Sequence, residues 1–180
     1  KGMTIAVLDT GLDTAHPAFA NAPADAKFTK DYVSGVLQAA DLNAEALMPG
    51  VTADDVYLSA KIPFAFDYAG DADPYTGEII SGDVNVRNSG SNHGTHVSGT
   101  VAGFVQSQEG EVLFSGVAPD AQLMMMKVFA DGGNSGATES AILNALEDAM
   151  TLGADAVNLS LGSDNGFAYD DTAIHGVYAR

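Results

Sequence analysis

Short apolar runs alternate with longer amphipathic stretches along this chain. Residues 3–8 have the pattern of a brief apolar strand, and residues 62–68 ("IPFAFDY") alternate as a strand does. Residues 121–129 ("AQLMMMKVF") are almost continuously apolar, which is typical of a parallel strand buried on both faces. Residues 154–161 ("ADAVNLSL") are predicted to form a further buried strand.

Two helices are predicted between these strands. Residues 138–152 place apolar side chains on one face, with Thr138 or Ser140 as a candidate N-cap and Gly153 as a candidate C-cap. Residues 94–105 are rich in small residues, which let a helix pack closely against its neighbours. The alternation of strands and helices predicts an α/β protein, a parallel sheet with helices on both faces.

Other segments carry weaker patterns. Residues 12–61 show little periodicity, although residues 39–60 mix acidic and apolar side chains and could hold a short helix. Residues 70–92 are rich in Asp, Gly and Asn, which predicts a loop. Asp71, Asp73 and Asp83 in this loop could hold a cation, but they lack EF-hand spacing. A solvated loop is therefore the favoured interpretation.

Composition and charge narrow the classes of function. The 180 residues carry 7 basic and 24 acidic side chains, a formal net charge of −17. Nucleic acid is disfavoured as a partner because phosphate contacts need clustered Lys and Arg. The acidic excess indicates either solubility or bound calcium, whose ligands are oxygen atoms. Cysteine is absent, which excludes disulfides and cysteine nucleophiles, and no apolar run approaches the ~18 residues of a membrane span.

An aspartate ends the first predicted strand. The stretch "VLDTGLDTAHP" (residues 7–17) places Asp9 at the carboxyl end of this strand, and a glycine two residues later turns the chain. Ligands of open α/β sheets bind outside these ends. Two classes of protease use such an aspartate: one activates water with a second aspartate, and the other orients a histidine that activates a serine.

A second motif decides between these two classes. In "NHGTHVSG" (residues 92–99), His93 begins a predicted helix and His96 lies one turn inside it. A histidine at a helix N-terminus is well placed as an exposed general base, whereas a zinc helix of the HExxH type needs a glutamate and another interval. A two-lobed aspartic protease needs a second Asp-Thr-Gly or Asp-Ser-Gly, which this chain lacks.

Together, these motifs resemble those of the subtilisin-like serine proteases (subtilases). Residues 114–129 ("FSGVAPDAQLMMMKVF") are similar to the family's Gly-Val-Ala-Pro segment and the central strand after it. Residues 155–163 ("DAVNLSLGS") are similar to its Asn-Met-Ser-Leu-Gly segment. The resemblance covers the whole chain in the right order. The long acidic insertion between Asp9 and His93 is most similar to the cell-envelope proteinase and C5a-peptidase-like branch of Gram-positive bacteria.

The resemblance implies a role for each residue of the two motifs. Asp9 would accept the ring N–H of His93, and His93 would take the proton from a serine hydroxyl. His96 matches a structural histidine of the family and is expected to be a packed, satisfied imidazole. Asp13 and His16 would shape the turn around Asp9 rather than react.

The resemblance also implies a substrate site. Two short segments would pair with an extended peptide or protein substrate by β-strand addition, one after the central strand and one forming a wall of the specificity pocket. The implied substrate-binding residues are Asn134, Ser135, Gly136, Ser160, Leu161 and Gly162.

Part of the family's machinery has no match in residues 1–180. The Gly-Thr-Ser-Met-Ala segment that carries the nucleophile and the Ala-Gly-Asn segment that carries the oxyanion asparagine are both missing. The chain is thus expected to be an incomplete, subtilisin-like catalytic domain that is inactive alone. Three explanations stay open: an excised piece, a domain interrupted by an insertion with its serine downstream, or a pseudoprotease that binds peptides without cleaving them.

Further expectations follow from the resemblance. No cofactor is needed for the chemistry, structural calcium is an option, and the protein is expected to be secreted or attached to the cell envelope. An incomplete sheet exposes an unpaired edge and apolar surface, so self-association, or pairing with the C-terminal part of the catalytic domain, is expected.

Overall fold

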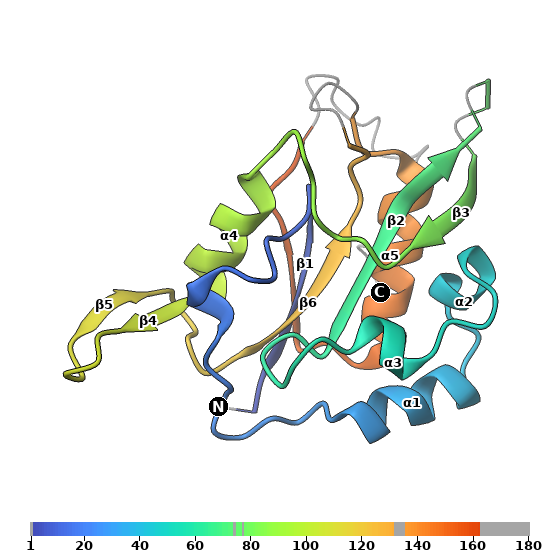
Figure 1. Ribbon diagram of the computed structural model, residues 1–180. Helices are drawn as coiled ribbons and strands as arrows, with labels where there is room; N and C mark the ends of the chain where they lie inside the picture. The colour runs from blue at the N-terminus through green and yellow to red at the C-terminus, as the bar shows by residue number, and fades with distance from the viewer. Residues whose placement is uncertain (1, 74, 77, 132–135, 163–180) are drawn as a thin grey trace.

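A five-stranded sheet with the strand order β3-β2-β6-β1-β7 forms the centre of the protein (Figure 1). The structure is a computed structural model that describes residues 2–73, 75–76, 78–131 and 136–162. Neighbouring strands are parallel except for β2 and β3, so the predicted α/β class with a mainly parallel sheet is confirmed. The strands are β1 (Thr4–Asp9), β2 (Phe64–Ala72), β3 (Ile79–Asp83), β6 (Gln122–Lys127) and β7 (Ala156–Leu159).

Strand β6 lies at the centre of the sheet because it is apolar on both faces. It pairs with β1 on one side and with β2 on the other, and all of its residues are buried. Met124 and Met126 belong to the core on one face, and Met125 belongs to the core on the other. The methionines therefore fill the core, as predicted for a continuously apolar strand.

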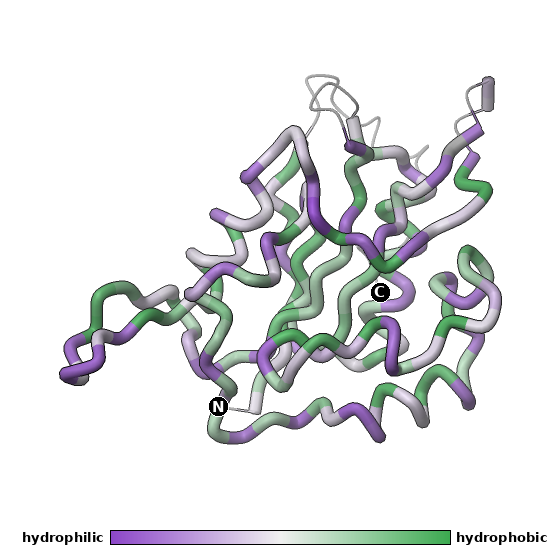
Figure 2. Tube along the Cα trace, viewed as in Figure 1, coloured by the Kyte–Doolittle hydropathy of each residue, from purple (hydrophilic) through white to green (hydrophobic). Residues whose placement is uncertain are grey.

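Helices cover both faces of this sheet (Figure 1). One core holds residues from four helices, and Figure 2 shows the hydrophobic central strands that they cover. The helices of this face are α1 (Lys30–Ala39), α2 (Asn43–Leu47), α3 (Ala53–Val56) and α5 (Glu139–Leu152). The core of the other face lies under α4 (His93–Ala102) and the short 3₁₀-helix η1 (Pro17–Phe19). No helix in the described part of the chain is long and apolar enough to cross a membrane.

Helix α5 begins and ends where its capping residues predict. The Thr138 side chain accepts a hydrogen bond from the Ala141 N–H at 3.2 Å. Gly153 has φ +88°, the left-handed conformation of a C-terminal cap, and its N–H donates to the carbonyls of Ala149 and Met150. These contacts satisfy backbone groups that a helix end leaves unpaired.

Two predicted boundaries are wrong. The segment 70–92 is not all loop, because β3 lies inside it and pairs antiparallel with β2. The pattern of β3 alone is too short to indicate a strand, and its pairing comes from the neighbouring β2. The predicted helix 94–105 ends at Ala102, because Gly103 is extended and the hairpin of β4 (Phe104–Gln106) and β5 (Val112–Ser115) follows.

The predictions for two other segments also need correction. The last strand, β7, is not buried: it pairs with β1 alone within the described residues, and Ala156 and Val157 are exposed. Residues 12–61 contain α1, whose pattern is weak because only Val33 and Leu37 of this helix are buried. The short helix considered for residues 39–60 is confirmed, because α2 and α3 both lie there.

Two buried charged side chains connect distant segments. The Lys61 ammonium donates to the carbonyls of Pro119 and Ala121, each at 2.7 Å. Burial lowers the pKa of Lys61 from 10.5 to about 8, although the negative charge of Asp120 raises it in part. The Asp148 carboxylate accepts from the Tyr68 hydroxyl at 2.7 Å and from backbone N–H groups of α2. Burial raises the pKa of Asp148 despite these hydrogen bonds.

Lys61 is predicted to make stability rise with pH in mildly alkaline solution. Above pH about 8 the native state loses the Lys61 proton while the unfolded chain keeps it, so the free energy of unfolding increases until the unfolded-state pKa is reached. Urea unfolding from pH about 7 to about 10 should show this rise, and Lys61→Met should remove it. Lys30→Met, at an exposed lysine, is the control that should keep the rise. Parallel pH curves for Lys61→Met and the unmodified protein would contradict the prediction.

Candidate active site

The chain turns sharply after β1 because residue 11 is glycine. Gly11 has φ +129°, a conformation that favours glycine, and an added Cβ would overlap the Val86 carbonyl oxygen and lie 3.2 Å from the Asn88 nitrogen. The next N–H, that of Leu12, donates to the same Val86 carbonyl at 2.8 Å. This turn leaves Asp9 at the carboxyl end of β1, next to the start of α4.

A second glycine lets α4 touch this turn. A Cβ on Gly94 would overlap the Gly11 carbonyl oxygen and lie 3.0 Å from Asp9 Oδ1. The Gly94 N–H donates to Thr10 Oγ1 at 2.9 Å. Backbone therefore packs on backbone at this contact, and only a residue without a side chain fits.

Side chains satisfy the free N–H groups where α4 meets the turn. The Gly94 N–H donates to Thr10 Oγ1, and the His93 N–H donates to Ser91 Oγ at 3.2 Å. The N-cap residue Asn92 makes no side-chain hydrogen bond to the helix. In the opposite direction, the Asp13 N–H donates to Thr95 Oγ1 at 2.8 Å. The turn and the helix thus exchange hydrogen bonds, which fixes the position of the first helical residue.

The structure brings together the two residues that the motifs single out. His93 Nδ1 lies 2.7 Å from Asp9 Oδ1, and Oδ1 also accepts from the Thr10 N–H at 2.6 Å. The Asp9 side chain is 1% exposed, and the His93 side chain is 53% exposed. Because a carboxylate can only accept, Nδ1 carries the proton of this contact and Nε2 keeps a free lone pair. A half-exposed imidazole in this tautomer can act as a general base.

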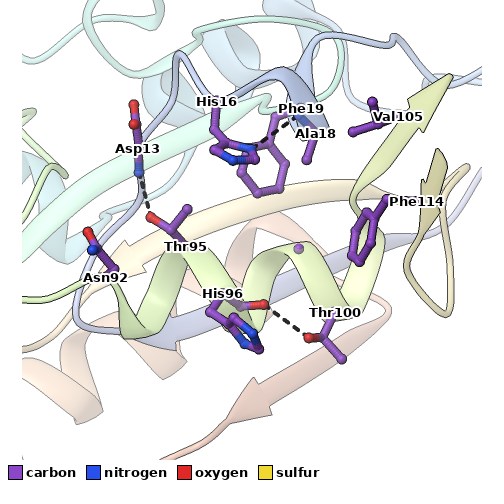
Figure 3. Close-up of a pocket in the computed structure, with 11 residues that line it drawn as sticks. Asp13, His16, Ala18, Phe19, Asn92, Thr95, His96, Thr100, Val105 and Phe114 are labelled. Carbon is purple, nitrogen blue, oxygen red and sulfur yellow. Dashed lines mark hydrogen bonds between the residues drawn. The ribbon is translucent and has the colours of Figure 1, made fainter. Parts of the chain in front are cut away.

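A cavity of about 570 Å³ lies beside the same helix, between α4, η1 and the β4–β5 hairpin (Figure 3). Asp9 and His93 do not line it. Its lining residues are Asp13, His16, Ala18, Phe19, Asn92, Thr95, His96, Gly99, Thr100, Val105 and Phe114.

The other residues of the two motifs, His96, His16 and Asp13, differ in whether the structure agrees with their expected roles. The prediction of a packed, satisfied His96 is wrong, because this residue is exposed and its ring makes no hydrogen bond within the part of the chain described. His16 Nδ1 accepts from the Ala18 N–H at 3.2 Å, and Asp13 Oδ1 accepts from the Ala15 N–H at the same distance. Both side chains therefore make hydrogen bonds inside the turn.

The two expected substrate segments follow the two strands that flank β1. Gly136 is exposed and comes after β6, next to the antiparallel bridge of Phe129 with Ala137, while Asn134 and Ser135 lie outside the described residues. After β7, Ser160 and Gly162 are exposed and Leu161 is partly buried. Ser160 Oγ donates to Asn158 Oδ1 at 3.0 Å. Their role in binding substrate stays a prediction.

The loop carboxylates considered for a cation are engaged in their own turns. Asp73 Oδ1 accepts from the N–H groups of Tyr75 and Thr76, Asp83 Oδ1 accepts from Asn85 N–H, and Asp71 Oδ2 accepts from Ser81 Oγ. Among the described residues, no group of three or more His, Asp or Glu side chains is arranged to hold a metal ion.

The fold and the site define an α/β protein in which a buried carboxylate at a strand end orients a histidine at a helix start. The model of the subtilase family matches residues 1–178, and the chain belongs to this family. The predicted family is thereby confirmed.

The relatives include the branches that the sequence indicated. A PII-type proteinase of Lacticaseibacillus paracasei is 33% identical over 168 residues, 92% of this chain and 8% of that protein. A C5a peptidase of Streptococcus pyogenes serotype M6 is 28% identical over 163 residues, 90% of this chain and 12% of that protein. The minor extracellular protease Vpr of Bacillus subtilis is 46% identical over 77 residues, 43% of this chain. The chain thus spans a small fraction of these relatives' lengths.

Gly94→Ala is predicted to force α4 away from the turn after β1. The added methyl overlaps backbone, so we expect a loss of about 2 kcal/mol in the free energy of unfolding and loss of the low-field NMR resonance of His93 Nδ1–H. Gly99→Ala is the matched control in the same helix, because nothing lies within 4 Å of its added Cβ. This control should be neutral or stabilising by up to about 1 kcal/mol. Equal effects of the two substitutions would show that the glycine contact is not required.

Proposed function

We propose that this chain is the Asp- and His-bearing part of the catalytic domain of a serine endopeptidase. The observation that carries the proposal is the 2.7 Å contact of Asp9 Oδ1 with His93 Nδ1 at the carboxyl end of β1, in a chain of the subtilase family. Asp9 holds the tautomer and stabilises the imidazolium. His93 Nε2 takes the proton of a serine hydroxyl and later gives it to the leaving amine.

The nucleophilic serine and the oxyanion asparagine belong to the proposed remainder of the domain, outside these 180 residues. No serine of this chain lies in a nucleophile motif of the family. Without the serine and the oxyanion donor, a protease loses several powers of ten in rate. The chain alone is therefore proposed to be inactive.

An extended peptide or protein is the proposed substrate. It would pair as a strand between the segment around Asn134, Ser135 and Gly136 and the segment Ser160–Gly162. The position of these segments after β6 and β7, the two neighbours of β1, supports the proposal because both follow strand ends at the edge that carries Asp9.

The exposed strand β7 gives the proposed partner a place to bind. Its second edge, which pairs with no strand among the described residues, and the exposed Val157 fit pairing with the remainder of the domain or, in its absence, self-association. A secreted or cell-envelope location is proposed from the relatives, one of which is named as extracellular. No cofactor takes part in the proposed chemistry, and structural calcium is proposed without assigned residues.

A pseudoprotease that binds peptides is the second candidate. Residues 1–180 hold the two proposed peptide-pairing segments but no nucleophile segment, a combination that a peptide binder without catalysis would also have. The two candidates differ in one respect that can be measured: whether the full-length protein cleaves peptides through a serine that reacts with a serine-directed inhibitor.

Substitution of Asp9 or His93 is predicted to abolish turnover by the full-length protein. Asp9→Asn and His93→Ala should each lower kcat by at least about 10⁴-fold in a fluorogenic peptide assay, because the base is mis-oriented or removed. His96→Ala is the matched control: it lies one turn further along the same helix, is exposed and does not contact Asp9, so kcat should stay within about twofold. A wild-type protein without inhibitor-sensitive turnover would support the pseudoprotease.

The isolated 180-residue chain is predicted to give no turnover that a serine-directed inhibitor abolishes. The same assay checks this with the purified chain. Inhibitor-sensitive cleavage by this chain would show that its nucleophile lies within the 180 residues, and would overturn the proposed division of the site.

A further inference from the structure

Three charged residues stand side by side at the carboxyl ends of three neighbouring strands. Lys127 on β6 is the in-register partner of Asp9 on β1 and of Asp67 on β2. Because paired strands lie about 4.8 Å apart, both carboxylates are within reach of a lysine side chain. The strand positions two residues earlier all belong to the core under α4, so the three charges share that face of the sheet. Those positions are Val7, Ala65 and Met125.

Lys127 makes its contacts on one side of this row. Its ammonium donates to Asp67 Oδ2 in a buried ion pair and lies 3.2 Å from Asp131 Oδ1. The Lys127 and Asp67 side chains are 3% and 5% exposed. Within the described residues, no hydrogen bond or ion pair joins Lys127 to Asp9. The lysine thus pairs with one of its two in-register aspartates and leaves the other.

Asp9 itself has an oxygen that could accept such a pair. Asp9 Oδ1 is occupied by Thr10 N–H and His93, but Oδ2 is buried and accepts no hydrogen bond within the described part of the chain. An ammonium one strand away would be strongly attracted to a buried carboxylate oxygen, because screening is weak away from water. A further interaction must therefore explain why the Lys127 ammonium contacts Asp67 and not Asp9.

The orientation of the Asp67 carboxylate, which is fixed by backbone hydrogen bonds, explains this choice of partner. Its Oδ1 accepts from the Ala69 N–H at 2.9 Å and the Gly70 N–H at 3.1 Å, which turns Oδ2 towards Lys127. Burial raises the pKa of the Asp67 carboxyl, and the Lys127 ammonium opposes this effect. The Lys127 ammonium thus helps to keep the buried Asp67 carboxyl ionised.

We propose that Asp67 is a positioning residue that holds the Lys127 ammonium away from Asp9, so that no second cation competes with His93 for the Asp9 carboxylate. An ammonium bound to Asp9 Oδ2 would compete with the imidazolium for the same carboxylate and would disfavour protonated His93. This inference rests on the proposed roles of Asp9 and His93. It adds to them a residue that acts through Lys127 and touches neither partner of the pair.

An NMR titration of the His93 Cε1–H resonance tests the proposal in the 180-residue chain. In Asp67→Asn, Lys127 loses its buried carboxylate partner and keeps only the exposed Asp131, so its ammonium is expected to turn to the buried Asp9 Oδ2. The midpoint of the titration should then fall by about one pH unit. In the double variant Asp67→Asn/Lys127→Met no ammonium remains, and the midpoint should return to within a few tenths of a unit of the unmodified chain. Asp131→Asn, at the exposed partner of Lys127, is the control that should leave the midpoint in place.

A purely structural role of Asp67 predicts a different result. Asp67→Asn would then lower the free energy of unfolding, but its His93 midpoint would equal that of the double variant, and this equality would overturn the proposal. If Asp67→Asn does not fold, the double variant still decides: a midpoint well above that of the unmodified chain would show that Lys127 already acts on Asp9, which also overturns it. The titration needs neither a serine nor turnover, so its outcome is independent of whether the chain proves to be part of a peptidase.

Discussion

The contact between the turn after β1 and the start of α4 is the constraint on which the site depends. Two glycine backbones, those of Gly11 and Gly94, meet at a distance that no side chain allows. This approach places an imidazole from one end of α4 against a carboxylate from the end of β1, although 84 positions separate them in sequence. The hydrogen bonds of Thr10 and Thr95 hold the approach in both directions. The glycines and threonines of the two motifs therefore serve the geometry of the acidic and basic residues.

The contact with the turn also explains why the two histidines of α4 differ in their interactions. His93 and His96 are three residues apart on α4, and both are exposed to a large extent. His93 rests on a buried carboxylate that fixes its proton, whereas His96 lines a cavity towards η1 and makes no hydrogen bond within the described residues. An exposed imidazole becomes a directed base only when a second group holds its other nitrogen.

The buried charges at the carboxyl end of the parallel sheet also depend on specific partners. The apolar strands stop at Asp9, Asp67 and Lys127, so three charges gather at one edge with little water around them. Each needs a partner because an unpaired buried charge is costly. In the observed pairing, Asp9 contacts His93 and Lys127 contacts Asp67, so the two neighbouring contacts stay separate. Elsewhere in the core, Lys61 and Asp148 satisfy the same requirement mainly with backbone groups of distant segments.

Local pattern determined much of this protein: the central strand around Met125, the ends of α5 at Thr138 and Gly153, and the two motifs that carry Asp9 and His93. Each of these depends on neighbours in sequence, through burial on both faces, capping, or the backbone freedom of glycine. Tertiary structure alone decided that β3 pairs with β2, that β7 lies at an edge, that His96 is exposed, and that Lys127 turns to Asp67 rather than to Asp9. The physical reason is that hydrophobic periodicity describes one element at a time. The partner across a sheet, and the choice of a lysine between the carboxylates of two in-register neighbours, are set by residues far away in the chain.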